Sequence, residues 1–343
     1  MKTISKFLTI ALVAGIFTAA SAQDIHFSQF SASPVTLNPA TTGAYTGTHR
    51  IIVNFKEQWK SVTNPYTTFS GSYDAPISKD LITEGALAGG IAFLSDKAGD
   101  LDFSTNAFIF SLAANKSIDQ KNNFSLGIQG GLSQRGISSD ASSQEWGNQY
   151  IAGSGFDPNA ASGETAVMEN FMFGDFSAGF LWRHTNDVIT AHLGFAGFHL
   201  NTPKQNFYAE SEKLHSRITA HGGVEYMFGQ TNFGLIPQFL FMKQGEQMEN
   251  NMGMLAKYVL DENLTVDGDI AQTAVYLGGW YRLGDAAIAN IRFDHRNMSL
   301  GISYDINLSS LKIVSSGQGG LEIALSCILP IPPPKRKVKR SLM

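Results

Sequence analysis

The residues whose types and spacing could support chemistry are few, and a general acid–base pair is the first arrangement to test. His221 and Glu225 lie four residues apart. On one β-strand, at about 3.3 Å per residue, they would be roughly 13 Å apart, too far for the hydrogen bond that an orienting pair needs. Asp294 and His295 are adjacent, so a strand would point them to opposite faces. Neither pair forms a catalytic dyad.

Charged residues on the hydrophilic sides of alternating segments are the next candidates. The set consists of Arg217, Glu225, Arg292, Asp294 and Asp305. Ion-pair networks commonly have structural roles. We therefore interpret these five residues as a charge network that rigidifies the structure.

Known catalytic and ligand-binding motifs are missing from the sequence. It has no HExxH, CxxC or GxSxG motif and no phosphate-binding loop. Its eight histidines lack metal-ligand spacing, and Asp157, Asn159 and Glu164 offer fewer oxygen ligands than the six to eight of a calcium site. We expect no enzymatic activity, no cofactor and no metal.

The first 22 residues have the three parts of a secretory signal peptide. Lys2 and Lys6 form the basic end, residues 7–19 are apolar, and Ala20-Ser21-Ala22 is a small-residue cleavage site. The mature protein is predicted to begin at Gln23. No later segment approaches the roughly 20 apolar residues of a membrane helix, so a helical membrane protein is excluded.

The amino-acid composition further narrows the class of protein. The single cysteine, Cys327, rules out a disulfide framework. A net charge of -4 and an isoelectric point near 6.1 give no reason to expect nucleic acid as a partner. Charged residues make up only 16%, with 34 glycines and 24 phenylalanines. This balance is typical of strands that face lipid on one side and water on the other.

Two-residue alternation is the main pattern of the chain. In RITAHGGVEYMF (217–228) and MSLGISYDINL (298–308), apolar and polar residues largely alternate, which is the period of a β-strand. Such runs, about 10 to 13 residues long, suit tilted strands that cross a bilayer. Aromatic residues near strand ends fit an interfacial belt. We place in it Trp59, Tyr226, Phe228, Trp280 and Tyr281.

These patterns predict an all-β fold, a transmembrane antiparallel β-barrel with the charge network inside its lumen. About fourteen runs lie between Arg50 and Leu329, an even number, as a closed single-chain barrel requires. With both chain ends in the periplasm, the connections Gly136–Asn170 and Asn201–Lys213 fall outside, together with the turn Leu283–Asp285. The connection Asp261–Gln272 falls on the periplasmic side. A soluble antiparallel sandwich, which also alternates, is the alternative.

Four stretches together resemble the PorP/SprF family of the Bacteroidetes. They are IHFSQFSASPVTLNPATTG (25–43), RIIVNFKEQW (50–59), FSGSYDAPI (69–77) and SYDINLSSL (303–311), in family order along the chain. The resemblance implies a non-enzymatic outer-membrane barrel of the type IX secretion system. Implied partners are the periplasmic lipoprotein ring and a peptidoglycan-binding partner, or the C-terminal domain of a large surface protein such as a gliding adhesin. A passive porin for small solutes is the alternative function.

The stretch after the signal peptide cannot be a barrel strand. Pro34 and Pro39 break any ladder, and Asn38-Pro39 favours a turn. We expect this segment, tethered at the lumen entrance, to form a plug or a docking surface on the periplasmic side. A loose leader is the alternative. Its candidate partner-binding residues are His26, Phe27, Ser28, Gln29, Phe30, Asn38 and Pro39.

The C-terminal end is proline-rich and basic. After Pro330, the tail carries five cations, Lys335, Arg336, Lys337, Lys339 and Arg340. They favour contact with an acidic partner or acidic lipid head groups, although a solvated terminus is equally consistent. The expected organisation is signal peptide 1–22, irregular segment 23–47, barrel 48–330 and periplasmic tail 331–343.

Overall fold

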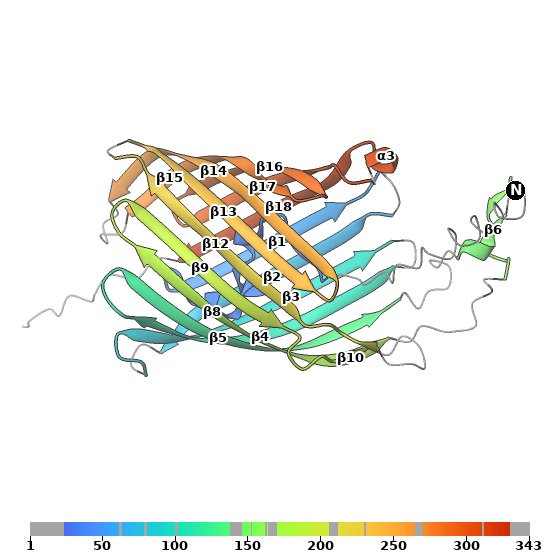
Figure 1. Ribbon diagram of the computed structural model, residues 1–343, viewed down its shortest axis with the longest axis horizontal. Coiled ribbons are helices and arrows are strands. Elements are labelled where there is room, and N and C mark those ends of the chain that lie inside the picture. Colours follow the sequence, from blue (N-terminus) through green and yellow to red (C-terminus); the bar gives the residue numbers. More distant parts are fainter. Residues whose placement is uncertain are drawn as a thin grey trace, which may run out of the picture.

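The computed structural model describes residues 24–61, 64–78, 81–99, 102–137, 146–151, 153–161, 163, 170–205, 212–229, 231–264, 270–310 and 312–329. Fourteen antiparallel strands close into a barrel in the order β1-β18-β17-β16-β15-β14-β13-β12-β9-β8-β5-β4-β3-β2 (Figure 1). Closure pairs the first strand with the last, so the sheet has no free edge. The predicted all-β fold and the number of strands are confirmed. The signal peptide 1–22 and the tail 331–343 lie outside the described residues.

The barrel strands are ten to eighteen residues long. They are β1 (His49–Gln58), β2 (Tyr66–Ser78), β3 (Gly85–Ala98), β4 (Phe103–Ser117), β5 (Asn122–Gly136), β8 (Phe171–Thr185), β9 (Ile189–Phe198), β12 (Arg217–Met227), β13 (Phe233–Gln244), β14 (Gln247–Leu264), β15 (Ile270–Arg282), β16 (Ala286–His295), β17 (Met298–Asn307) and β18 (Gln318–Leu329). Two-stranded ribbons outside the barrel pair β6 (Tyr150–Ile151) with β7 (Gly155–Phe156) and β10 (Lys204–Gln205) with β11 (Glu212–Lys213).

The described helices are single turns. They are η1 (Phe30–Ala32), α2 (Pro34–Leu37), η2 (Pro39–Thr41), η4 (Gly147–Gln149) and α3 (Lys312–Ser315). Among the described residues, no helix is long and apolar enough to span a membrane.

Alternation sorts the side chains between the two faces of the wall. On β17, Leu300 and Tyr304 are about two-fifths exposed, whereas Ser303 and Asp305 are 1% and 2% exposed. The same division recurs on β5 and β12. The outer surface is therefore apolar, as lipid contact requires.

One predicted member of the aromatic belt lies inside. Trp280 is only 4% exposed and belongs to a cluster of buried apolar residues within the lumen, whereas its neighbour Tyr281 points outward and is 47% exposed. Adjacent residues of a strand point to opposite faces, so the two could not share the belt. The lumen is therefore partly apolar instead of uniformly polar.

The long connections share one end of the barrel. Because β1 pairs with β18 and its first residue His49 lies opposite Leu329, one end, here called the terminal end, holds the start of β1 and the end of β18. The connections β5 to β8, β9 to β12 and β15 to β16 lie at the other end, here called the long-loop end. The predicted grouping of these three connections at one end is confirmed, and their position outside the cell stays a prediction. The connection predicted at Asp261–Gln272 is shorter, since β14 and β15 pair as far as Leu264 and Ile270.

Candidate functional site: a segment inside the barrel

The N-terminal segment (residues 24–48) crosses the lumen from end to end. At the long-loop end, the backbone N–H of Asp24 donates to Oε1 of Gln244, the last residue of β13, at 2.9 Å. At the terminal end, the N–H of Thr48 donates to the carbonyl of Leu329 at 2.9 Å. The helical turns of the segment lie within the barrel (Figure 1). The segment is therefore tethered at one entrance of the lumen, as expected, and it extends through the lumen to the opposite end.

The local fold of the segment follows from its prolines. Pro34 begins α2 and Pro39 begins η2, where a missing N–H costs no hydrogen bond. Asn38 caps η2, because its Oδ1 accepts from the N–H of Ala40 at 2.9 Å. A chain of single turns is narrow enough to fit inside the barrel. Many of its backbone N–H and C=O groups form hydrogen bonds within the segment.

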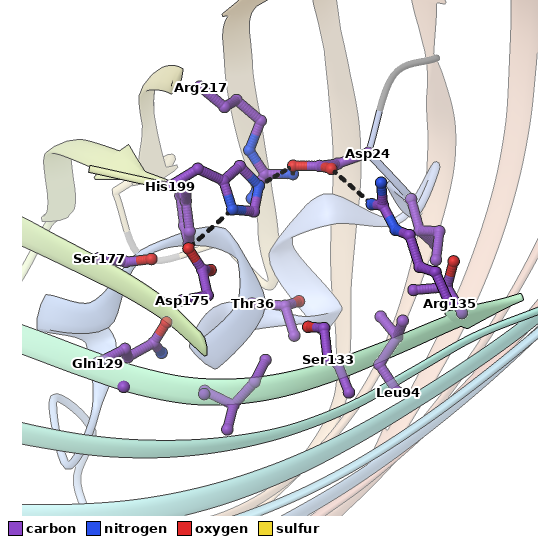
Figure 2. A pocket seen from close by; sticks show the side chains of 17 residues that line it. Asp24, Thr36, Leu94, Gln129, Ser133, Arg135, Asp175, Ser177, His199 and Arg217 are labelled. Carbon is purple, nitrogen blue, oxygen red and sulfur yellow. Dashed lines mark hydrogen bonds and ion pairs between the residues drawn. The ribbon is translucent and has the colours of Figure 1, made fainter. Parts of the chain in front are cut away.

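The first residues of the segment, at the long-loop end, are fixed by a group of charged residues, here called the Asp24 hub (Asp24, Arg135, Asp175, His199 and Arg217). Figure 2 shows the hub beside a cavity. The Asp24 carboxylate lies 3.3 Å from Nη1 of Arg217 and 3.5 Å from Nη2 of Arg135, and it also contacts Nε2 of His199. Nδ1 of His199 lies 2.9 Å from Asp175. One carboxylate of the segment therefore joins β5, β12 and the end of β9.

Near its start, toward the long-loop end, the segment is held by a second group, here called the Ser28 cluster (Ser28, Lys56, Arg282, Asp305 and Glu322). The fully buried carboxylate of Glu322 accepts the backbone N–H groups of Ser28 at 2.7 Å and Gln29 at 2.9 Å. The Ser28 hydroxyl donates to Asp305 at 2.8 Å and accepts from Arg282 at 2.9 Å. Buried charges require such partners, so the cluster fixes both the position and the direction of the backbone.

Apolar contacts complete the fit. Phe27 packs with Leu94 and Ala107. The ring of Phe30 meets Trp280 edge to face, with 5.8 Å between centroids, a favoured aromatic geometry. The buried apolar residues of this part of the lumen are Phe30, Ile236, Leu240, Leu255, Ala274, Tyr276, Trp280 and Ile288.

The candidate partner-binding residues of the segment all contact the wall. His26 lies 3.2 Å from Glu249. Asn38 donates through Nδ2 to the Phe180 carbonyl at 3.0 Å and lies 3.1 Å from Nε2 of His221. Contacts of this kind were expected for the segment. Binding of a partner protein to the same residues stays a prediction, and such a partner would have to displace the segment. The tail cations Lys335, Arg336, Lys337, Lys339 and Arg340 lie outside the described residues.

The predicted charge network is divided between the two ends of the barrel. Arg217 contacts Asp24, and Asp305 contacts Arg282. Elsewhere, Glu225 pairs with Lys257 at 2.6 Å and Arg292 with Asp294 at 2.6 Å. All five predicted residues form ion pairs, but a single network of the five is wrong, because Glu225, Arg292 and Asp294 lie near one another around Tyr276 whereas Arg217 and Asp305 lie toward the long-loop end.

Sequence reasoning missed the charges that bind the segment from the closing strands. Lys56 of β1 and Glu322 of β18 lie directly opposite each other across the closing pair. Each occupies an inward position in its alternating strand, which was the available signal. Their proximity required knowledge that the first and last strands pair.

His221 and Glu225, tested above as an acid–base pair, do not hydrogen-bond to each other in the described part of the lumen. His221 binds Asn38 and Glu225 binds Lys257, so the two candidates have separate partners. No group of three or more His, Cys, Asp and Glu residues suited to a metal ion occurs among the described residues.

A closed barrel with an apolar outer surface and a chain segment inside its lumen defines a β-barrel membrane protein. The family model of the "Type IX secretion system membrane protein PorP/SprF" matches residues 19–326. The chain belongs to this family, and the family resemblance of the four sequence stretches is confirmed.

Solved structures with a similar architecture are distant in sequence. The CymD monoaromatic hydrocarbon channel is 9% identical with a TM-score of 0.44, and the match covers 90% of this chain and 95% of that chain. The toluene transporter TodX of P. putida is 10% identical with a TM-score of 0.44, covering 86% and 93%. A FadL homologue of Pseudomonas aeruginosa is 12% identical with a TM-score of 0.44, covering 84% and 91%. No curated protein matches the sequence.

Proposed function

We propose that this protein is a non-enzymatic outer-membrane barrel of the type IX secretion system. In this role it supports secretion or surface attachment of a large cell-surface protein, such as a gliding adhesin, by protein–protein recognition. The observation that carries the proposal is the N-terminal segment, which is held inside the lumen at both ends, at Ser28 near its start and at Asn38 in its middle. A barrel with an occupied lumen offers its rims and loops to other proteins.

The same observation argues against a passive porin. The spaces beside the segment include cavities of about 100, 140 and 350 Å³. In liquid water one molecule takes up about 30 Å³, so each cavity has room for only a small group of water molecules. An aqueous channel for solutes would require the segment to move.

Family membership indicates the secretion system in which the proposed function takes place. Membership in the PorP/SprF family supports partnership with type IX secretion components. We place the long-loop end outside the cell and the terminal end in the periplasm, since barrels carry longer loops outside and short turns inside. The lipoprotein ring and a peptidoglycan-binding protein would then meet the terminal end, together with the basic tail.

Affinity capture from detergent-solubilised outer membranes tests the proposal. We expect the tagged barrel to recover lipoprotein-ring subunits or one large secreted protein. Recovery of neither, together with stable open-channel conductance of the purified protein in planar bilayers, would contradict the recognition function and favour the porin.

A second arm of the same test concerns secretion itself. Cells that lack the barrel should lose the surface protein from their exterior, and the full-length gene should restore it. A variant with residues 331–343 removed serves as a comparison, because it keeps the barrel and removes only the predicted tail. Normal surface display without the barrel would overturn the proposal.

A further inference from the structure

A cavity of about 350 Å³ lies between the N-terminal segment and the strands β1, β8, β9 and β12. We name it the terminal-end cavity, because its exposed residues Thr46, Thr185 and Thr190 lie next to the start of β1 and the turn between β8 and β9. His221, which is 2% exposed, lies at its buried side. Its volume is within the range of small-molecule pockets, about 300–1,000 Å³.

The lining of this cavity carries an unbalanced positive charge. Two guanidinium groups, those of Arg50 and Arg183, line it, and none of its described lining residues is Asp or Glu. Asp74 neutralises Arg50 through two hydrogen bonds of 2.9 and 2.8 Å. Arg183 donates to the backbone carbonyl of Ala44 and forms no ion pair among the described residues. A half-buried guanidinium favours a bound anion.

His221 adds a hydrogen-bond donor at a defined atom. The Oδ1 of Asn38 accepts from the N–H of Ala40, which fixes the orientation of the amide. Nδ2 of Asn38 is therefore the group that faces Nε2 of His221 at 3.1 Å. Nδ2 can only donate, so Nε2 accepts, and the proton of the neutral ring is on Nδ1. Nδ1 is buried and has no hydrogen-bond partner among the described residues.

The remaining lining explains which anions fit. Thr46, Thr185 and Thr190, which carry hydroxyl groups, lie at the mouth, and Leu37 and Leu181 form an apolar part of the wall. Donors with a net positive charge suit a carboxylate or phosphate group. The apolar part leaves room for a short hydrocarbon body beside it.

We propose that the terminal-end cavity binds a small anion that carries a carboxylate or phosphate group. The guanidinium of Arg183 supplies the charge, His221 lies at the buried side, and the threonines at the mouth carry hydroxyl groups that can donate. Because the N-terminal segment forms one side of the cavity, such a ligand also contacts the segment and stabilises its position in the lumen.

Isothermal titration of the purified full-length mature barrel in detergent tests this site, at constant ionic strength with chloride as the background anion. The probes are inorganic phosphate and hexanoate, which distinguish the two kinds of head group. We expect saturable binding of one probe or both, with one site per barrel. Binding of neither probe to the wild-type protein overturns the proposal.

Variants locate the site. Arg183→Gln removes the charge at similar length and should weaken binding at least about tenfold, since hydrogen bonds to charged groups are the strong ones. Lys121→Gln is the matched control, because Lys121 is an exposed cation in the turn between β4 and β5 at the same end. It should bind like the wild type. Equal binding by Arg183→Gln and the wild type contradicts the site.

A second variant protects the test against a folding defect. If Arg183→Gln loses the heat-modifiable migration of a folded barrel, Thr185→Val with Thr190→Val replaces it, because both residues are exposed at the mouth. Loss of two donors should weaken binding about threefold or more. Unchanged affinity in this variant would show that the anion binds elsewhere.

Discussion

At the level of single residues, glycines in the barrel wall allow the N-terminal segment to lie close to the wall. A Cβ atom on Gly127 would lie 2.3 Å from the carbonyl carbon of Pro39 and 2.4 Å from the nitrogen of Ala40. A Cβ atom on Gly194 would lie 2.7 Å from Nδ2 of Asn38. The segment therefore occupies the space where wall side chains would otherwise be.

Gly127→Val should push the segment away from β5. The added atoms would meet backbone rather than a flexible side chain, so overpacking should cost about 1–3 kcal/mol. We expect chymotrypsin to cleave after Phe27 and Phe30, which are 4% and 3% exposed in the native protein. Gly130→Val on the same strand is the control, because a Cβ there meets nothing within 4 Å. Equal protection of both variants would contradict the contact.

Asp24→Asn tests the Asp24 hub. Loss of the carboxylate leaves Arg217 and Arg135 without their shared counter-ion in a site where the side chains are about one-tenth exposed. Breaking a buried ion pair costs about 3–5 kcal/mol, although the Asn amide would recover part of it. The expected result is a lower midpoint of thermal unfolding, measured on the barrel in detergent.

Two further variants serve as a control and as a coupling test for the effect of Asp24→Asn. Asp187→Asn changes an exposed carboxylate in the turn between β8 and β9 and should leave the midpoint unchanged. The double variant Asp24→Asn with Arg217→Gln should lose less than the sum of the two single variants, because the partners are in contact. Strict additivity would indicate that the 3.3 Å pair contributes no coupling.

The secondary-structure elements differ in how strongly the local sequence determines their structure. The barrel strands follow from alternation, and the segment follows from Pro34, Asn38 and Pro39, which make single turns in place of a strand. A segment of this kind has few internal contacts, so its stability comes from the wall around it. We therefore expect the barrel to assemble without it.

Deletion of residues 24–42 should open the lumen. Without the segment, the interior of a fourteen-stranded barrel is wide enough for an aqueous channel. We expect the variant to give discrete conductance steps in planar bilayers and the full-length protein to give few or none. The variant without residues 331–343 controls for loss of chain length. Equal conductance of all three proteins would show that the segment does not close the lumen.

At the scale of the whole molecule, the path of the chain determines the rim of the barrel at which each end of the described chain lies. The described chain starts at the long-loop end with Asp24, crosses the lumen, and enters β1 at the terminal end. The two ends of the barrel chain thus lie at opposite rims: Asp24 at one and Leu329 at the other.

An epitope tag placed before Asp24 should therefore be exposed on the same side as a tag in the connection between β5 and β8. With the long-loop end outside, antibody added to intact cells should label both tags, and a tag at the C-terminus should require permeabilised cells. Labelling of the N-terminal tag only together with the C-terminal tag would contradict the observed path of the segment.

The sequence by itself determined the strands of the barrel and the face that each side chain takes. Period-two alternation acts between neighbours in the chain, so Leu300, Tyr304 and Ser303 could be assigned locally and are found as predicted. Proline chemistry likewise excluded the N-terminal segment from the sheet. These properties depend on a residue and its near neighbours, which a single sequence contains.

Only the tertiary structure decided which distant residues meet. Closure of the barrel brings Lys56 opposite Glu322 and thereby builds the Ser28 cluster. The path of the segment brings Asp24 to Arg135 and Arg217 and buries Trp280 against Phe30. Such contacts join residues up to 294 positions apart. Their geometry depends on strand order, register and the space left inside the wall, and no local pattern encodes these.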